Sequence, residues 1–255
     1  TEQGNPMNFP TSDSTSEVGE ILAETAPAST LDPSFGTVGL NTYKYSSKVV
    51  TVPIELLQDS SVDIEAFVRA LIVRRIGRIT NQHFTTGTGT GQPRGVVTGA
   101  ASGKVGTSGQ TLTVIYDDLV DLQESIDEAY QQGGTCRFMM AQGSRKVIRK
   151  IKDTSGRPIW TPSYEGGMGV GAADMLLGKE LVINNDMPTM AANAKSIIFG
   201  DFSKYIIRDA LNVQLMRFDD SAFASKGQVG FLAFIRSGGN LVDTGAVKYY
   251  ANSAT

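Results

Sequence analysis

Glycine and threonine alternate in one stretch of the chain, and backbone amides left free in such a stretch can bind phosphate. The stretch runs from Thr85 to Gly95 and reads Thr-Thr-Gly-Thr-Gly-Thr-Gly-Gln-Pro-Arg-Gly. A phosphate-binding loop leaves a strand, opens a helix and carries Lys followed by Ser or Thr after its last glycine. This stretch instead follows a predicted helix and continues through Gln92 and Pro93. The pattern therefore predicts a sharp turn and not a nucleotide site.

A second glycine-rich stretch, Gly167 to Ala172, loosely matches the dinucleotide-binding fingerprint. That fingerprint needs a strand before it and a helix after it. No clear strand precedes this stretch, and Gly178 interrupts the helix that would have to follow. We expect a surface loop here.

The chain has one histidine, His83, and one cysteine, Cys136. Structural zinc needs about four Cys and His ligands, so a zinc site of this kind is excluded. His83 ends an arginine-bearing helix with no nucleophile motif nearby, and Cys136 begins a strand-like segment in which a buried thiol is expected. An intermolecular disulfide through Cys136 stays open. We therefore expect no catalytic residue, no cofactor site and no metal site.

Charged residues offer two further possibilities. Neighbouring carboxylates can act as an acid–base pair, although helix caps and solvated faces explain them better. The arginines of the long helix can contact phosphate or form salt bridges between subunits. With 23 Lys and Arg against 26 Asp and Glu, the net charge of -3 gives no general attraction to DNA or to an anionic membrane. The candidate carboxylates are Asp117, Asp118, Glu124, Asp127, Glu128, Asp219 and Asp220. The candidate arginines are Arg74, Arg75 and Arg78.

These residues lie on predicted helices and predicted strands, which indicates an α+β fold. At 255 residues and 40% hydrophobic content, the chain can form one large domain or two smaller ones. No run of about 18 apolar residues exists that could span a bilayer. The clearest predicted strands are Cys136–Met140, Ser196–Phe199, Tyr205–Arg208, Asn212–Phe218 and Gln228–Arg236.

The strongest predicted helix runs from about Val62 to Phe84, with Ser60 or Ser61 as its cap. At about 1.5 Å per residue it spans roughly 30 Å. Its apolar stripe consists of Ile64, Phe67, Val68, Leu71, Ile72 and Ile79. A second helix is predicted from about Asp117 to Gly133, with Leu119, Leu122, Ile126 and Ala129 on one face, and a short basic helix over Arg145–Lys152.

The front of the chain contains few apolar residues. Residues 1 to about 20 are polar and lack an apolar period, which predicts an arm that does not order by itself. From Glu20 to Ile54 two extended runs flank a Gly- and Pro-containing middle, which predicts a long hairpin. Val50, Val52 and Ile54 share one face of its second run. Two strands alone are marginal in water, so we expect the hairpin to lie on its own domain or on a neighbouring molecule.

The order of these features resembles the tailed-phage major capsid family of the Hong Kong 97 type from about Glu24 to the end. Each motif is weak alone, but together they are specific. The matching motifs are Pro53–Ser60, the long helix, Gly87–Gly95, Lys152–Arg157, Leu177–Gly178, Met187–Pro188 and Phe199–Phe202.

The resemblance implies the Hong Kong 97-type capsid fold with four parts. These are an N-terminal arm over 1–22, an extended hairpin loop over 23–54, a peripheral domain over 55–109 and 196–236, and an axial domain with the C-terminal strand over 110–195 and 237–255. In some relatives a hairpin lysine is joined covalently to an asparagine of a neighbour. Lys44 and Lys48 are the lysines placed for this.

The implied function is that of a non-enzymatic major capsid protein, assembled in the host cytoplasm and located in the virion. Its copies would form pentamers and hexamers of an icosahedral phage head, with arm and hairpin contacting neighbouring capsomers. Further implied partners are portal and scaffolding or decoration proteins, and packaged double-stranded DNA bound without sequence specificity; no membrane is implied. The alternatives are an encapsulin-type nanocompartment shell and, more remotely, a nucleotide-dependent soluble enzyme.

Overall fold

The computed structural model describes residues 4–12, 19–22, 27–30, 35–156 and 175–255. Within these ranges the chain contains both helices and strands, which confirms the predicted α+β class. The elements in chain order are β1 (Met7–Ser12), β2 (Phe35–Leu40), β3 (Tyr43–Ser46), β4 (Val50–Pro53), α1 (Ile54–Asp59), α2 (Ile64–Thr86), α3 (Val96–Gly99), β5 (Ala101–Val105), α4 (Tyr116–Glu124), α5 (Glu128–Gln131), β6 (Cys136–Met140), α6 (Gln142–Ile148), β7 (Met175–Leu176), β8 (Lys179–Ile183), β9 (Lys195–Asp201), a 3-10 turn (Phe202–Lys204), β10 (Tyr205–Phe218), α7 (Ser221–Ala224), β11 (Gln228–Leu241) and β12 (Val247–Ala251).

The chain divides into two compact units. Unit 1 comprises residues 1–7, 40–98 and 207–240, and unit 2 comprises residues 8–39, 99–206 and 241–255. The expected peripheral and axial domains stay a prediction; residues 99–109 and 196–206 fall in unit 2. These two segments contain β5 and β9, which both pair with β12 of the same unit.

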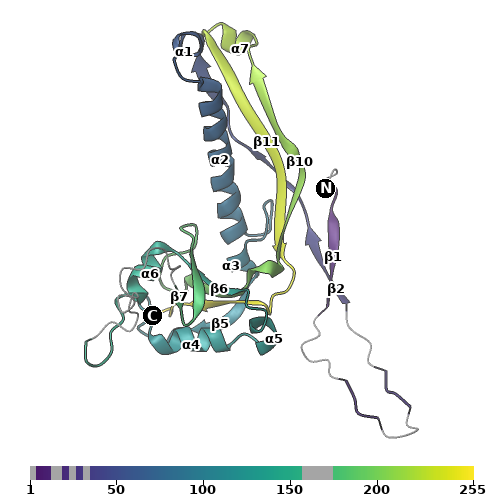
Figure 1. Ribbon diagram of the computed structural model, residues 1–255, viewed down its shortest axis with the longest axis vertical. Coiled ribbons are helices and arrows are strands. Elements are labelled where there is room, and N and C mark those ends of the chain that lie inside the picture. Colours follow the sequence, from purple (N-terminus) through teal and green to yellow (C-terminus); the bar gives the residue numbers. More distant parts are fainter. Residues whose placement is uncertain (1–3, 13–18, 23–26, 31–34, 157–174) are drawn as a thin grey trace. The chain divides into compact units, whose positions relative to one another are not determined.

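Unit 1 consists of helix α2 packed on an antiparallel sheet (Figure 1). The sheet has the order β10-β11-β3, and β4 also pairs with β11. The core between helix and sheet contains Val68, Ile72 and Ile76 from α2 and Val52, Val229, Phe231 and Ala233 from the strands. Val50 and Ile54 pack against this core, so the predicted shared face of Val50, Val52 and Ile54 is confirmed.

The prediction that the two runs between Glu20 and Ile54 pair with each other as a hairpin is wrong. The run from Tyr43 to Pro53 pairs along β11, from Ser237 opposite Tyr43 to Gln228 opposite Pro53. The two-stranded ribbon is instead β1 with β2, so it begins inside the segment expected to be a free arm. An alternating apolar pattern fixes which face of a strand is buried but not which distant strand lies beside it, and this explains the error.

Helix α2 starts two residues later than predicted. Asp63 caps it, with Oδ1 accepting from the backbone N of Ala66 at 3.0 Å, in place of Ser60 or Ser61. The helix ends at Thr86, two residues beyond the predicted end. None of the helices in the described ranges is long and apolar enough to cross a membrane.

Unit 2 is built on a six-stranded mixed sheet of order β5-β12-β9-β6-β8-β7. The predicted strand Cys136–Met140 is confirmed as β6. The predicted helix from Asp117 to Gly133 is two helices, α4 and α5, because the chain turns at Ser125–Asp127. Leu119, Leu122 and Ile126 are buried as expected, whereas Ala129 is exposed. The basic helix α6 begins and ends earlier than predicted, at Gln142 and Ile148.

Candidate assembly surfaces

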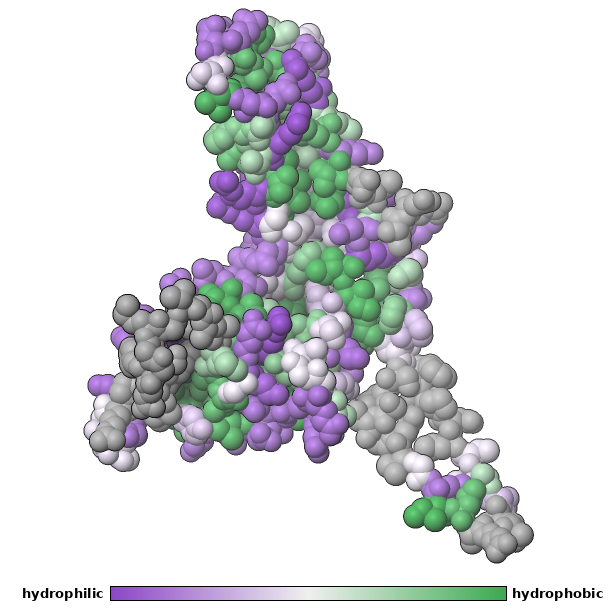
Figure 2. All heavy atoms as spheres, viewed as in Figure 1, coloured by the Kyte–Doolittle hydropathy of each residue, from purple (hydrophilic) through white to green (hydrophobic). Residues whose placement is uncertain are grey.

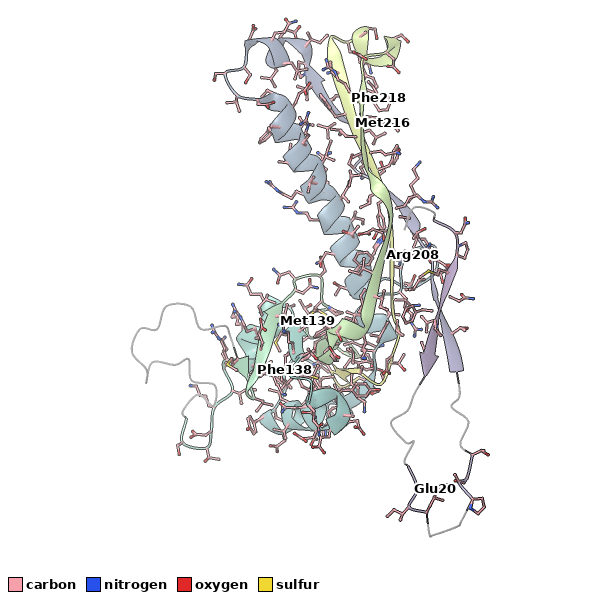
Figure 3. All side chains as sticks on the ribbon, turned by 45° about the vertical axis from the view of Figure 1, so that its right-hand side comes forward. Glu20, Phe138, Met139, Arg208, Met216 and Phe218 are labelled. Carbon is pink, nitrogen blue, oxygen red and sulfur yellow. The ribbon has the colours of Figure 1, made fainter. Side chains whose placement is uncertain are left out.

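A buried arginine holds both ends of the hairpin formed by β1 and β2. Arg208 lies on β10 (Figure 3) and is 8% exposed. Its Nη1 donates to the carbonyl oxygen of Asn5 at 2.8 Å and to that of Leu40 at 2.9 Å. Asn5 precedes β1 and Leu40 ends β2, so one guanidinium bonds to both sides of the hairpin base. Hydrogen bonds from an ionised donor are stronger than neutral ones. This role could not be predicted from the residue types, because the acceptors of Arg208 are main-chain oxygens.

Two further side chains bind the segment before β1. The carbonyl oxygen of Gly4 accepts from Oγ1 of Thr42 at 3.1 Å and from Nη2 of Arg236 at 3.4 Å. A side chain at Gly4 would collide with the Arg236 guanidinium, whose Nη2 lies 2.2 Å from the position of a Cβ atom. The chain is therefore held closely just before the hairpin leaves this base.

The far end of the hairpin exposes apolar side chains (Figure 2). Ile21 is 102% exposed and Leu22 is 47% exposed. The Glu20 carboxylate accepts from both the backbone N and Oγ of Ser29, at 2.5 Å each, and these bonds lower the pKa of Glu20. The apolar surface here can leave water only when another molecule covers it.

The sheet of unit 1 offers a groove of about 490 Å³. Lys44 stands over the ring of Phe234 there, with Nζ 4.0 Å from the ring centroid. On the neighbouring strand β10, Val213, Leu215 and Met216 are all exposed. Among the strands that the structure describes, β10 pairs with β11 alone, so it is an edge strand, a feature that commonly pairs with another chain. The groove is lined by Thr42, Lys44, Gln214, Met216, Phe234, Ile235 and Arg236.

The outer side of α2 combines apolar and cationic residues. Phe67 is 59% exposed and Val73 is 64% exposed. The expectation that Phe67 belongs to the buried stripe is wrong, because the sheet covers only the side bearing Val68, Ile72 and Ile76. Arg74, Arg75 and Arg78 are exposed and form no ion pair with any residue in the described ranges. Their positive charge is available to another molecule.

The Thr85–Gly95 stretch closes on itself. Gly89 N donates to the Pro93 carbonyl at 3.3 Å, Gly95 N to the Gly87 carbonyl at 2.9 Å and Gly87 N to the His83 carbonyl at 2.9 Å. A Cβ atom at Gly95 would lie 2.5 Å from the backbone of both Gly87 and Thr85, so glycine is required by close approach. These amides are already used, which agrees with the predicted turn and leaves them unable to bind phosphate. The stretch Gly167–Ala172 lies outside the described residues.

His83 and Cys136 both have internal partners. Nδ1 of His83 lies 3.1 Å from the hydroxyl oxygen of Tyr45, and burial raises the pKa of Tyr45 to about 12. Cys136 is buried, as predicted, and its Sγ donates to the Tyr130 carbonyl at 3.3 Å. Burial, and then the nearby Asp201 carboxylate, raise the pKa of the Cys136 thiol. A protonated, buried thiol is a poor nucleophile.

The carboxylates act mainly as caps and in ion pairs. Asp118 is buried and its Oδ2 accepts from Ile115 N at 3.3 Å, at the start of α4. Asp127 caps α5 by accepting from Ala129 N at 2.8 Å. Asp121 bonds to Lys104 and raises the pKa of that amine. The described ranges contain no group of three or more His, Cys, Asp or Glu placed to hold a metal ion.

The remaining predicted residues belong to several separate elements. Asp219 and Asp220 are exposed before α7. Lys48 is exposed and has a positive φ of 59°, at the break between β3 and β4. Glu124 and Glu128 line a hollow of unit 2 together with Asp127. The surfaces that stand out are thus the hairpin, the sheet groove and the outer side of α2.

The known proteins that match this chain are capsid proteins. The phage capsid family matches residues 1–252. The capsid of a native GTA particle is 25% identical, with a TM-score of 0.82 over 99% of this chain and 86% of that one. The capsid of an empty GTA particle is 27% identical, with a TM-score of 0.78 over 97% and 85%.

A structure from Mycobacterium phage Bobi is 14% identical, with a TM-score of 0.70 over 100% of this chain and 88% of that one, a likeness of fold. The comparison with curated proteins gives no match. The predicted Hong Kong 97-type fold is confirmed by these capsid neighbours. The chain belongs to the phage capsid family.

Proposed function

We propose that this chain is a major capsid protein whose copies assemble into an icosahedral shell around packaged double-stranded DNA. The observation that carries the proposal is the likeness along the whole chain to a capsid subunit, at a TM-score of 0.82 over 99% of its residues. The role is structural, and the location is the virion.

The finer assignments follow the same proposal. Unit 1 corresponds to the peripheral domain and the sheet of unit 2 to the axial domain, which meets its copies at the axes of pentamers and hexamers. The hairpin contacts neighbouring subunits. Portal, scaffolding or decoration proteins are further partners, and assembly takes place in the host cytoplasm.

The exposed surfaces support assembly as the function. Ile21 at the far end of the hairpin has no cover, and edge strand β10 has exposed apolar residues on it. Repeated contacts between different surfaces of identical copies close into rings when the rotation closes. A subunit with an anchored hairpin and an uncovered sheet edge has two such surfaces.

Electron microscopy of negatively stained, purified protein tests the proposal. We expect uniform closed shells, alone or with a co-expressed scaffolding protein. A sample that remains monomeric at every salt and protein concentration would overturn it. Shells that contain protein cargo and no DNA when isolated from the natural host would favour the encapsulin-type alternative.

A matched variant tests the role of the hairpin. Replacing residues 13–34 by Asn-Gly joins β1 to β2 through a two-residue turn and leaves Arg208 and both its acceptors in place. We expect this subunit to unfold at the same temperature as the wild type but to form no stable shells. Normal shells from it would show that the hairpin is not an assembly contact.

A further inference from the structure

Unit 2 carries two oppositely charged surfaces. Residues 116–132 include six carboxylates and no Lys or Arg, whereas residues 142–152 include five Lys and Arg and no carboxylate. We call Glu124, Asp127 and Glu128, which are exposed and line one hollow, the acidic surface. The basic surface consists of Arg145, Lys146, Arg149, Lys150 and Lys152.

The basic surface is one face of α6 and the turn after it. Ser144 and Ile148 point into the unit and are buried. The charged residues other than Lys152 line an open hollow of about 760 Å³ together with Asn185 and Thr189. Lys146, Lys150 and Lys152 are exposed and form no ion pair with any residue that the structure describes. Five cations within eight residues of one another repel one another. A partner of opposite charge would remove that repulsion.

The acidic surface lines a separate hollow of about 650 Å³. Glu124 has no ion pair among the described residues, and Asp127 and Glu128 accept only from an amide of their own helix and from Gln132. Lys248 is the one amine at this hollow, and its Nζ donates to the Ser125 carbonyl. The hollow therefore keeps a net negative charge.

The two surfaces cannot neutralise each other within one subunit. The hollows share no lining residue, and Figure 1 shows α6 and α5 at opposite ends of unit 2. Every copy carries both surfaces, so a head-to-tail contact between copies pairs each basic surface with an acidic one. We infer that the basic surface of one copy binds the acidic surface of the next copy in a ring. This inference rests on the proposed function and names one of its contacts.

A second copy fits these observations better than DNA does. Phosphate would neutralise the basic surface but would leave the acidic one without a role and would be repelled by it. Exposed ion pairs each contribute little, so several of them set the orientation and the rate of association more than the total affinity.

Charge reversal at both surfaces tests the contact. Lys146→Glu/Lys150→Glu lowers the charge of the basic surface from +5 to +1, and Glu124→Lys/Glu128→Lys changes the charge of the acidic surface from −3 to +1. We expect either double variant to lower the yield of shells about tenfold or more while the subunit unfolds at the wild-type temperature. In the quadruple variant the two introduced glutamates can pair with the two introduced lysines of the next copy, so it should recover part of the yield. Lys146→Arg/Lys150→Arg keeps the charge and should assemble normally.

The outcomes separate the contact from the function. If either double variant assembles like the wild type, or if the quadruple variant recovers nothing although it folds, the contact is overturned. Normal shells from Lys146→Glu/Lys150→Glu that contain less DNA would show that the basic surface binds DNA. That result would also overturn the proposed contact. Failure of the wild type itself to form shells would count against the proposed function instead.

Discussion

In strand β9 of unit 2, the residues from Ser196 to Asp201 are all buried, whereas in strand β10 of unit 1 the residues from Val213 to Arg217 are all exposed. Strand β9 has a hydrogen-bonded neighbour on each side, β12 and β6. Strand β10 has one, β11. Position in the sheet thus decides burial, although both strands are rich in apolar residues. The central strand β9 is thus covered within its own unit, while the edge strand β10 keeps one side without a strand neighbour among the described residues.

Helices α4 and α2 also differ in how completely their apolar side chains are buried. Helix α4 in unit 2 buries Leu119 and Leu122 and exposes mainly carboxylates. Helix α2 in unit 1 buries Val68, Ile72 and Ile76 on one side but leaves Phe67 exposed on another. A two-layer unit can cover only one side of a helix, so the second apolar side of α2 needs a cover from elsewhere.

The largest expected effect tests whether unit 2 depends on its core. Phe199 and Phe138 are fully buried with ring centroids 4.4 Å apart. Phe199→Ala removes a ring and leaves a cavity, so we expect a loss of about 3–5 kcal/mol of unfolding free energy in urea. Met216→Ala on the exposed strand should cost less than about 0.5 kcal/mol. Similar losses for the two variants would contradict the comparison.

The next effect concerns the hairpin base. Arg208→Met leaves the carbonyl oxygens of Asn5 and Leu40 without their charged donor, at a cost of about 1–3 kcal/mol in unfolding free energy. Because the base loosens, we also expect faster cleavage of the hairpin by a protease and fewer shells. Arg217→Met is the control, since Arg217 is exposed and its ion-pair partner among the described residues is Glu65 on the surface. Unchanged proteolysis of Arg208→Met would show that the base is held by other contacts.

Features set by nearby residues could be predicted from the sequence. The period of Val68, Ile72 and their neighbours predicted α2, and the apolar segment Cys136–Met140 predicted a strand. Each of these two elements is determined by the pattern of apolar residues within its own short segment.

Features set by distant pairing could not be predicted. The pairing of β3 and β4 with β11 joins residues nearly two hundred positions apart, and no local pattern encodes it. The opposite charges of α4–α5 and α6 are visible in the sequence, but only the fold shows that α5 and α6 lie at opposite ends of one unit. Three-dimensional arrangement thus converts two charge runs into two complementary surfaces.

Alkaline pH provides a smaller test, specific to unit 1. Burial raises the pKa of Tyr45 to about 12, above the value of about 10 in an unfolded chain. Below pH 10 the hydroxyl is neutral in both states. As pH rises from 10 to 12 the unfolded chain loses this proton first, so the fold loses up to about 2 kcal/mol of stability. Tyr45→Phe should remove this part of the pH dependence in urea unfolding measured between pH 9 and 12. An identical pH profile for the variant would mean that Tyr45 ionises freely in the fold.

The smallest effect uses a glycine on the uncovered side of α2. Gly77 lies in the helix, is exposed, and a Cβ atom there would have nothing within 4 Å. Gly77→Ala reduces the entropy of the unfolded chain and should raise the unfolding free energy by up to about 1 kcal/mol. Ala70→Gly, also exposed on α2, should lower it by a similar amount and serves as the reverse control. Thermal unfolding of the single subunit measures both. Because an added methyl group meets nothing within one subunit, a Gly77→Ala variant that is more stable but assembles poorly would show that a neighbouring chain approaches α2 closely at this position.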